Sequence, residues 1–566
     1  MIHICNVELA RRLGALMSRC AAVVLTAALV GPVAAQSLRI ALSSEPTAVD
    51  PHYHDLAPNN ALAAHVFDAL VDNDENQRLV PSLATAWKND GANKWTFTLR
   101  KGVKFSNGAP FTAEDFIFTL CRIVKNETSI AGGGKDVINN MRAVEASDPH
   151  TLVITTVEPE PLLPRLLAGV RILSKSIVPH GRVSFSLESG CGVTGPWPTV
   201  TQFNEGSVAI GTGPYKLKSY VRGSGIELER HEGHWAGRPT WDAVKFVTVT
   251  NAGPRLAGLM AGEYDVIENP AARDVDRLLK DKRFAAVSTP SSRVIYFQLD
   301  VGRNPSPLVR DDQGGKGGNP LQDIRVRRAL SMAIDRDAMA KRLMDGAAAP
   351  AYQFLPTGMF GTLPKPPVIR YDPQQAKQLL REAGYPKGFE LTISATNDRY
   401  VNDGQIAQAV AAYLSQIGIR TKVDAMTRAL YFPRRAKKEF SFALGGWGSA
   451  EGSSFLRYWA VSPDDKKTRG GSNYGGLADK ELDAIVGKAI VTMDDDKRAD
   501  LVRKGVSRLL ETHAFIPLHF ENTLWAYRAD LALKGRNDQY TLAMSVTPVG
   551  TQRPAAPRGA PAKPGS

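Results

Sequence analysis

The sequence WTFTLRKGVKF at Trp95–Phe105 alternates apolar and polar residues on both sides of Lys101-Gly102. An apolar residue at every second position is typical of a half-buried β-strand, and glycine between two such runs marks a turn. The stretch therefore predicts a β-hairpin. The sequence GAPFTAED that follows at Gly108–Asp115 predicts a helix from Thr112 to about Lys125, because a threonine followed by two carboxylates favours a helix amino terminus.

Working outward, the chain alternates further helices and strands. Asp372-Pro373 predicts a helix start and Gly384 its end. An apolar stripe over 406–417 predicts a second helix, and the alternation over 419–423 predicts a strand directly after it. A strand is also expected at Leu38–Leu42. Helix followed by strand is typical of a crossover unit, so the fold class is α/β.

Length and charge limit the classes of protein. A chain of 566 residues exceeds what one hydrophobic core usually organises, so two or three lobes are expected. The net charge is +13, and removing the three arginines and one glutamate of residues 1–36 leaves 67 basic and 56 acidic residues, or +11. Acidic residues are interspersed among the basic ones, which indicates a solvated surface and no nucleic-acid partner.

The amino terminus has the parts of an export signal. Three arginines within residues 11–19 precede the apolar run Ala21–Val30, and a small-residue cleavage site ends at Ala35. The run is shorter than the roughly 20 residues that span a bilayer. We therefore expect residues 1–36 to be a signal peptide, cleaved near Ala35, and the protein to be periplasmic. Cys20 precedes the apolar run, so no lipoprotein anchor is expected, and either Met1 or Met17 can be the start.

Cysteine spacing leaves one question open and excludes one kind of site. Beyond the leader only Cys121 and Cys191 remain, and they form either one disulfide or two buried thiols. No C-x-x-C pair occurs, so neither a redox motif nor a zinc ribbon is expected.

Motifs of enzymes are absent or incomplete. The chain contains no G-x-S-x-G elbow. His231 and His234 are three residues apart, whereas a metalloprotease helix needs a spacing of four. The pair of glycines at Gly211–Gly213 lacks the third glycine of a dinucleotide site. We therefore expect no enzymatic activity, no cofactor and no metal.

A series of motifs extends along almost the whole chain after the leader. The motifs are LATAW at Leu83–Trp87, the Trp95–Phe105 and Gly108–Asp115 stretches, GTGPY at Gly211–Tyr215, LMAGEYD at Leu259–Asp265, DIRVRRAL at Asp323–Leu330 and AGYP at Ala383–Pro386. In this order they resemble family 5 of the extracellular solute-binding proteins of ABC importers, the family that includes dipeptide-, oligopeptide- and nickel-binding proteins.

The resemblance implies an α/β periplasmic binding protein of two lobes, class II-like and of the large cluster C type, with two crossing hinge strands. By analogy, lobe I comprises 37–289 and 522–552, and lobe II comprises 290–521. The stretch 313–319 is expected to be a mobile loop, and the Pro- and Ala-rich tail 553–566 is expected to be disordered. The function implied is that a monomer captures a solute between its lobes and delivers it to the permease subunits in the inner membrane.

Site residues follow from the same resemblance. Arg399 and Tyr400 fall where dipeptide-binding relatives carry an arginine that pairs the ligand carboxylate, and a planar guanidinium suits such a contact. Relatives that bind peptides carry an aspartate shortly after a Gly-Trp pair, and it anchors the peptide amino terminus. Here Gly446-Trp447 lacks that aspartate. Glu451 is the candidate replacement, and the alternative is an exposed loop carboxylate.

Four aromatic or imidazole side chains complete the candidate set, and each has a structural role as its alternative. Trp447 is a candidate to stack on the ligand, and Tyr53, His54 and Tyr431 are further candidate contacts. Because the aspartate is missing, the solute is either peptide-like or a non-peptide compound such as an opine, a sugar conjugate or a metal chelate. A periplasmic chaperone-like protein is the third alternative.

Overall fold

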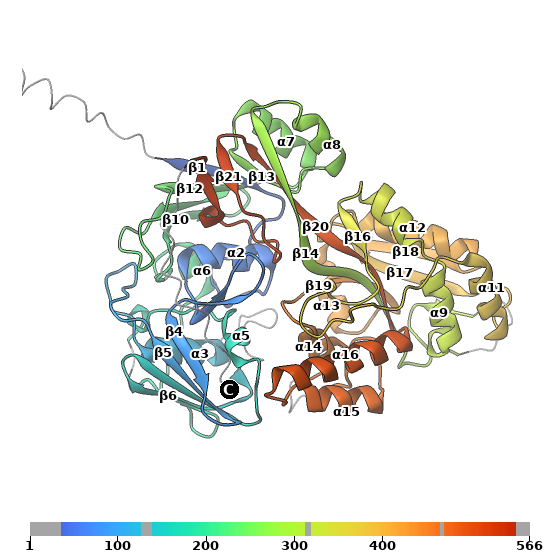
Figure 1. The fold of residues 1–566 in the computed structure, drawn as a ribbon, viewed down its shortest axis with the longest axis horizontal. Helices are drawn as coiled ribbons and strands as arrows, with labels where there is room; N and C mark the ends of the chain where they lie inside the picture. The colour runs from blue at the N-terminus through green and yellow to red at the C-terminus, as the bar shows by residue number, and fades with distance from the viewer. Residues whose placement is uncertain (1–35, 126–137, 180, 312–317, 465–468, 551–566) are drawn as a thin grey trace, which may run out of the picture.

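A computed structural model describes residues 36–125, 138–179, 181–311, 318–464 and 469–550 (Figure 1). The predicted leader apart from Gln36, most of the predicted loop 313–319 and the predicted tail 553–566 lie outside these ranges.

Two lobes share one twelve-stranded sheet, whose main path runs β10-β11-β12-β1-β13-β20-β14-β19-β17-β15 (Figure 1). The lobe I strands are β10 (Tyr215–Val221), β11 (Gly225–Arg230), β12 (Ala243–Thr248), β1 (Ser37–Leu42) and β13 (Val266–Glu268). The lobe II strands are β19 (Phe442–Gly448), β17 (Glu390–Thr396), β15 (Val309–Arg310), β18 (Arg420–Met426), which pairs with β17, and β16 (Ala348–Pro350), which pairs with β20. The predicted strand at Leu38–Leu42 is confirmed as part of β1.

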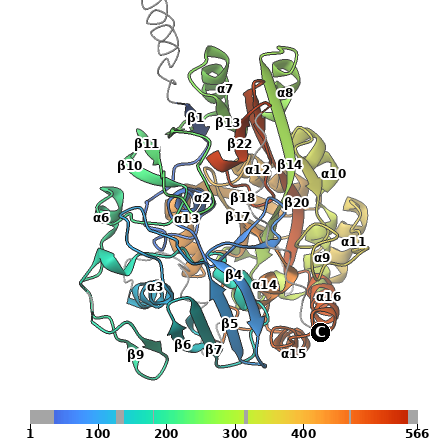
Figure 2. The same cartoon turned by 60° about the vertical axis from the view of Figure 1, so that its left-hand side comes forward.

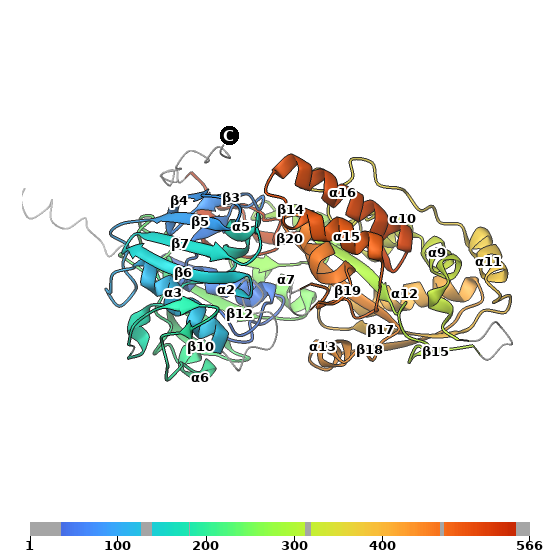
Figure 3. The same ribbon diagram turned by 90° about the horizontal axis from the view of Figure 1, so that it is seen from below.

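Two long strands connect the lobes. β14 (Phe284–Leu299) and β20 (Phe515–Arg528) run antiparallel from the pair Phe284 and Arg528 to the pair Gln298 and Phe515. Their register shifts between Pro290 and Val294. Figure 3 shows both strands passing between the lobes. The α/β architecture of two lobes with two crossing strands is therefore confirmed.

A second sheet, of six strands, belongs to lobe I alone (Figure 2). Its order is β4 (Ala84–Asn89), β5 (Lys94–Leu99), β7 (Thr151–Thr156), β6 (Met141–Asp148), β8 (Phe185–Ser186) and β9 (Gly190–Cys191). Cys191 of β9 is disulfide-bonded to Cys121, with 5.5 Å between their Cα atoms. The bond ties this sheet to the helix α3 (Ala113–Lys125) and answers the question that cysteine spacing left open.

The strand predicted around Trp95 is correct, but the hairpin is wrong. β5 pairs with β4 and β7, whereas Val103 and Phe105 are buried beside a tight turn of their own. In that turn the Phe111 amide donates to the Val103 carbonyl oxygen and the Phe105 amide donates to that of Ala109. Alternation indicates which side chains are buried, and it does not identify the strand that pairs.

The predicted helices are present. α3 begins after Thr112, but there both the amide and the hydroxyl of Thr112 donate to the Asp115 carboxylate, at 2.8 and 3.1 Å. α11 (Pro373–Glu382) has Asp372 as its cap. α12 (Asp403–Gln416) connects the parallel strands β17 and β18, which confirms the crossover unit.

The remaining elements cover the sheets. In lobe I they are α2 (Ala57–Val66), β2 (Val71–Asn73), β3 (Leu79–Pro81), α5 (Leu163–Leu167), α6 (Val200–Asn204), α7 (Ala252–Ala261), α8 (Ala272–Leu278), β21 (Leu531–Leu533) and β22 (Val546–Pro548). In lobe II they are α9 (Ile324–Met332), α10 (Arg336–Ala338), α13 (Arg428–Ala436), α14 (Gly452–Phe455), α15 (Lys480–Ala489) and α16 (Asp495–Thr512).

The hydrophobic cores follow the lobes. The largest cluster draws its buried members from 38–266 and 525–546. Two further clusters, on opposite faces of β19, draw theirs from 294–520. The lobe boundaries at 289/290 and 521/522 stay a prediction, since the crossing strands are continuous through them.

Candidate ligand-binding site

Arg399 and Tyr400 lie in the loop between β17 and α12. The carboxylate of Asp403 accepts hydrogen bonds from both of their amides, at 3.0 and 3.1 Å, which fixes the loop. The Tyr400 hydroxyl donates to the Gly446 carbonyl oxygen at 3.2 Å. A Cβ atom at Gly446 would lie 2.5 Å from the Tyr400 ring, so this position requires glycine. The structure thus brings together three of the predicted site residues.

Two guanidinium groups flank the Tyr400 ring. The Cζ atom of Arg399 is 5.1 Å from the ring centroid and that of Arg293 is 6.0 Å from it, both within the range of cation–π contact. Burial lowers the pKa of Arg399 to about 10, and the positive charge of Arg293 lowers it further. The buried Nε atom of Arg399 has no hydrogen-bond partner in the structure.

Lobe I faces this loop with the segment that follows β1. The guanidinium of Arg428, at the start of α13, donates to the Ser44 hydroxyl at 2.8 Å. His54 is half-buried, and its pKa is lowered by burial and then by the charges of Arg428 and Arg399. Tyr53 and His54 meet edge to face, with ring centroids 6.2 Å apart. We call Arg293, Arg399 and Arg428 the arginine cluster, which His54 and Ser44 approach from lobe I.

Glu521 of β20 stabilises the loop that carries Arg399. Its carboxylate accepts from the Val401 amide at 3.2 Å and from the Gln539 side chain at 3.1 Å, and it lies 3.7 Å from the Arg293 guanidinium. Sequence reasoning missed Arg293, Arg428 and Glu521. A charged residue inside an apolar strand is a usable signal for Arg293 and Glu521, because charges are rarely buried unless they are paired.

Trp447 lies on the other face of β19 from Gly446, as successive strand residues must. Its ring packs on that of Phe455 with centroids 5.4 Å apart, in the core cluster beneath α14. The structure therefore does not place Trp447 beside Arg399. Its role as a ligand contact stays a prediction.

Glu451 is not an exposed loop carboxylate, so that alternative is wrong. Its side chain is 2% exposed and caps α14, accepting from the amides of Ser453 and Ser454 at 2.8 and 2.9 Å. An acidic residue before a helix satisfies amides that have no partner within the helix. This carboxylate is thus already engaged within the protein, and its predicted role at a ligand ammonium stays untested.

Tyr431 is fully buried, and its hydroxyl donates to the Leu444 carbonyl oxygen. The ring stacks on Phe440 at 4.9 Å between centroids. In this arrangement Tyr431 presents no surface to a solute, and its predicted role is not supported by its position.

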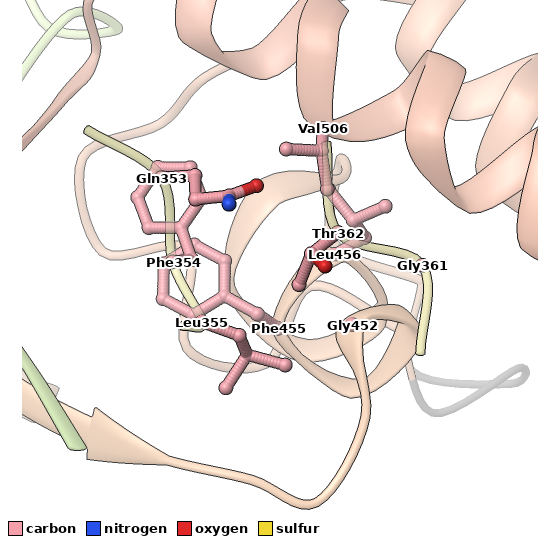
Figure 4. Close-up of a pocket in the computed structure, with 9 residues that line it drawn as sticks. All are labelled: Gln353, Phe354, Leu355, Gly361, Thr362, Gly452, Phe455, Leu456 and Val506. Carbon is pink, nitrogen blue, oxygen red and sulfur yellow. The ribbon is translucent and has the colours of Figure 1, made fainter. Parts of the chain in front are cut away.

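Each lobe also contains a small cavity. The lobe I cavity lies between α2 and the carboxyl ends of β1 and β13, where Ser44 and Glu268 line it. The lobe II cavity lies beside α14 and α16, and Figure 4 shows the stacked rings of Phe354 and Phe455 along it. The lobe II cavity is lined by Gln353, Phe354, Leu355, Gly361, Thr362, Gly452, Phe455, Leu456 and Val506.

A second set of cross-lobe contacts lies on the Trp447 side of β19. Arg457 donates to Glu160 of lobe I at 2.7 Å, and the two side chains are 6% and 3% exposed. Nearby, Arg469 and Glu158 are 3.2 Å apart, and Glu158 is 42% exposed. We call these four residues the interlobe bridge.

In the part of the chain that the structure describes, we find neither a metal-binding group nor a membrane-spanning helix. No group of three or more His, Cys, Asp or Glu side chains there is arranged to hold a metal ion. None of the described helices combines the length and the apolar character that a bilayer crossing demands.

Comparison with known proteins places the chain among solute-binding proteins. The family model for bacterial extracellular solute-binding proteins, family 5 middle, matches residues 78–467. The dipeptide-binding protein of Escherichia coli K12 is 26% identical over 446 residues, which cover 75% of this chain and 78% of that relative. The glutathione-binding protein of Salmonella typhimurium LT2 is 26% identical over 509 residues, covering 88% and 92%.

A solved structure has the same fold. The binding protein AgaA from A. tumefaciens R10, in complex with agropinic acid, matches with a TM-score of 0.74 and 20% identity. The match covers 91% of this chain and 99% of AgaA.

Proposed function

Since the chain belongs to family 5 of the bacterial extracellular solute-binding proteins and is the solute-binding component of an ABC importer, we propose that its solute carries a carboxylate that Arg399 binds. The observation that supports this is the guanidinium of Arg399. It is enclosed beside a second arginine, and it forms no ion pair with any carboxylate of the described residues. A partly buried cation without an ion pair is costly, so a ligand anion is its natural partner.

We also propose how binding closes the molecule. In this proposal lobe I comprises 37–289 with 522–552, lobe II comprises 290–521, and the hinge lies in β14 and β20 near the register shift at Pro290–Val294. His54 and Ser44 come from lobe I, and Arg399 comes from lobe II. A solute that contacts both sides favours the closed state by its difference in affinity between the open and closed states.

The solute need not present a free ammonium group. Peptide-binding relatives are expected to use an aspartate after Gly-Trp, and here Glu451 caps α14 instead. This favours a peptide-like or non-peptide carboxylic acid over a simple zwitterionic peptide. Dipeptide, glutathione and agropinic acid, named for the relatives, are all small organic acids and set the size range of the proposed solute.

Native mass spectrometry of the exported protein as purified tests the proposal. We expect a retained small molecule that contains at least one carboxylate, identified after denaturation. A neutral or purely cationic solute overturns the role of Arg399. If the protein is empty, titration calorimetry of Arg399→Gln against wild type with an acidic peptide library decides the same question.

Further proposals concern the export, the oligomeric state and the absence of catalysis. We propose that the leader is cleaved near Ala35 with no lipid anchor, that the mature protein is a monomer, and that it catalyses no reaction. Intact-mass measurement of the exported protein, light scattering, and assays with chromogenic esters and peptides test these three statements in turn.

A further inference from the structure

We propose that the solute carries two anionic groups, one bound by Arg399 and the other by Arg428. This inference rests on the proposed function, because it adds a second charge to the same solute. It assigns to Arg428 a role in selecting dianions over monoanions.

Three carboxylates near the Arg399 loop have partners within the protein. Asp398 accepts from the Arg428 amide at 2.7 Å, and Asp403 accepts from the amides of Arg399 and Tyr400. Glu521 accepts from Val401 and Gln539, and the guanidinium nearest to it is that of Arg293. Among the described residues, Glu521 forms an ion pair with Arg293, and its charge also acts on Arg399 from farther away. The guanidiniums of Arg399 and Arg428 themselves form no ion pair with any described residue.

Both of these guanidiniums face the same segment of lobe I. Arg428 reaches the Ser44 hydroxyl at 2.8 Å, and the charges of Arg428 and Arg399 both act on His54. Two like charges held close together in a partly buried space repel each other. A solute with two anions relieves this repulsion more than a solute with one, so it gains more from closure of the lobes.

Matched probes that differ by one charge test the inference. The pairs are N-acetylglutamate with N-acetylglutamine, Ala-Glu with Ala-Gln, and Ala-Ala-Glu with Ala-Ala-Gln. In titration calorimetry, we expect wild type to bind the acidic member of at least one pair about ten-fold tighter, in line with a charged hydrogen bond. Equal affinity within every pair, or no binding of any acidic member, overturns the inference.

Variants locate the second anion. Arg428→Gln should abolish the preference within a pair, because the second anion loses its partner, and Arg428→Lys should keep part of the preference. Arg434→Gln is the matched control, because it removes the same charge from the same helix α13 at a residue already paired with Glu439 and Asp424. A preference that survives in Arg428→Gln overturns the inference.

The same data separate the two proposals. Arg399→Gln should weaken binding of both members of a pair. If Arg399→Gln weakens binding but wild type shows no preference, only the second anion is wrong. If Arg399→Gln leaves the affinity of every bound probe unchanged, the proposed function itself is wrong.

Discussion

The two regions where the lobes meet differ in how their charges are balanced. In the interlobe bridge, Glu160 and Arg457 are buried together at 2.7 Å. In the arginine cluster, the guanidinium groups of Arg399 and Arg428 form no ion pair among the described residues, and that of Arg293 lies 3.7 Å from the Glu521 carboxylate. The bridge pairs charges across the two lobes without a solute, whereas in our proposal Arg399 and Arg428 take their counter-charge from the solute. On that proposal, the bridge supports closure and the arginine cluster makes closure depend on a ligand.

Breaking the bridge should have the largest effect. Glu160→Ala removes the carboxylate beside buried Arg457 and should destabilise the ligand-free protein by about 3 kcal/mol, because breaking a buried pair is more costly than never forming it. Thermal unfolding and a larger radius of gyration in X-ray scattering should report the change. Glu160→Leu combined with Arg457→Leu should recover much of the loss, and a double variant as unstable as the single one would falsify the electrostatic explanation.

Removing a charge from the arginine cluster should lower the affinity for the solute without lowering the stability of the fold. Arg399→Gln should lower the affinity for the natural solute about 30- to 100-fold, which is about 2–3 kcal/mol for a charged hydrogen-bonded contact. The midpoint of thermal unfolding without solute should stay the same or rise, because a partly buried charge without an ion pair is removed. A large fall in that midpoint would mean that Arg399 stabilises the fold in the way that the bridge does.

The more exposed ion pair of the interlobe bridge, Arg469–Glu158, should contribute less to stability than the buried pair. Glu158→Gln should reduce stability by less than about 1 kcal/mol, because Glu158 is 42% exposed and solvent screens its contact with Arg469. Comparing the loss of unfolding free energy in Glu158→Gln and in Glu160→Gln measures how burial changes the contribution of an Arg–Glu ion pair to stability. Equal losses in the two variants would contradict the claim that the buried pair contributes more.

Lowering the pH should have the smallest of these effects on stability, and it acts at the arginine cluster through His54. Burial and the nearby arginines lower the folded-state pKa of His54, so its contribution to stability is present above the ordinary histidine pKa of about 6.5 and is lost as pH falls below it. Buried histidines such as His52 and His519, with pKa values lowered to about 4, add to the total loss. His54→Asn should lose slightly less stability than wild type between pH 7 and pH 5.5, as measured by thermal unfolding.

Local patterns predicted local structure well. The capping residue Asp372, the apolar stripe of α12 and the alternation in β5 all lie where expected, because each depends on neighbours within a few residues. The partner of β5 could not be predicted in this way. Its neighbours β4 and β7 pair with it through the packing of the whole lobe I sheet.

The candidate site was predicted in part. Arg399, Tyr400 and Gly446 meet as neighbours, although 46 residues separate Tyr400 from Gly446. Glu451 and Tyr431 are buried within the protein, which no local pattern indicated. Arg293 and Arg428 were missed because each belongs to the cluster only through contacts between distant segments.

By itself the sequence determined the family, the α/β class, and the positions of many helices and strands, since motifs and periodicity record constraints that act over short stretches. Only the tertiary structure decided which charges are paired. Glu160 is paired with a residue 297 positions away, while Arg399 has no such partner. The electrostatic energy of a charge depends on what surrounds it in space and on how far water is excluded, and neither quantity is written in the order of the residues.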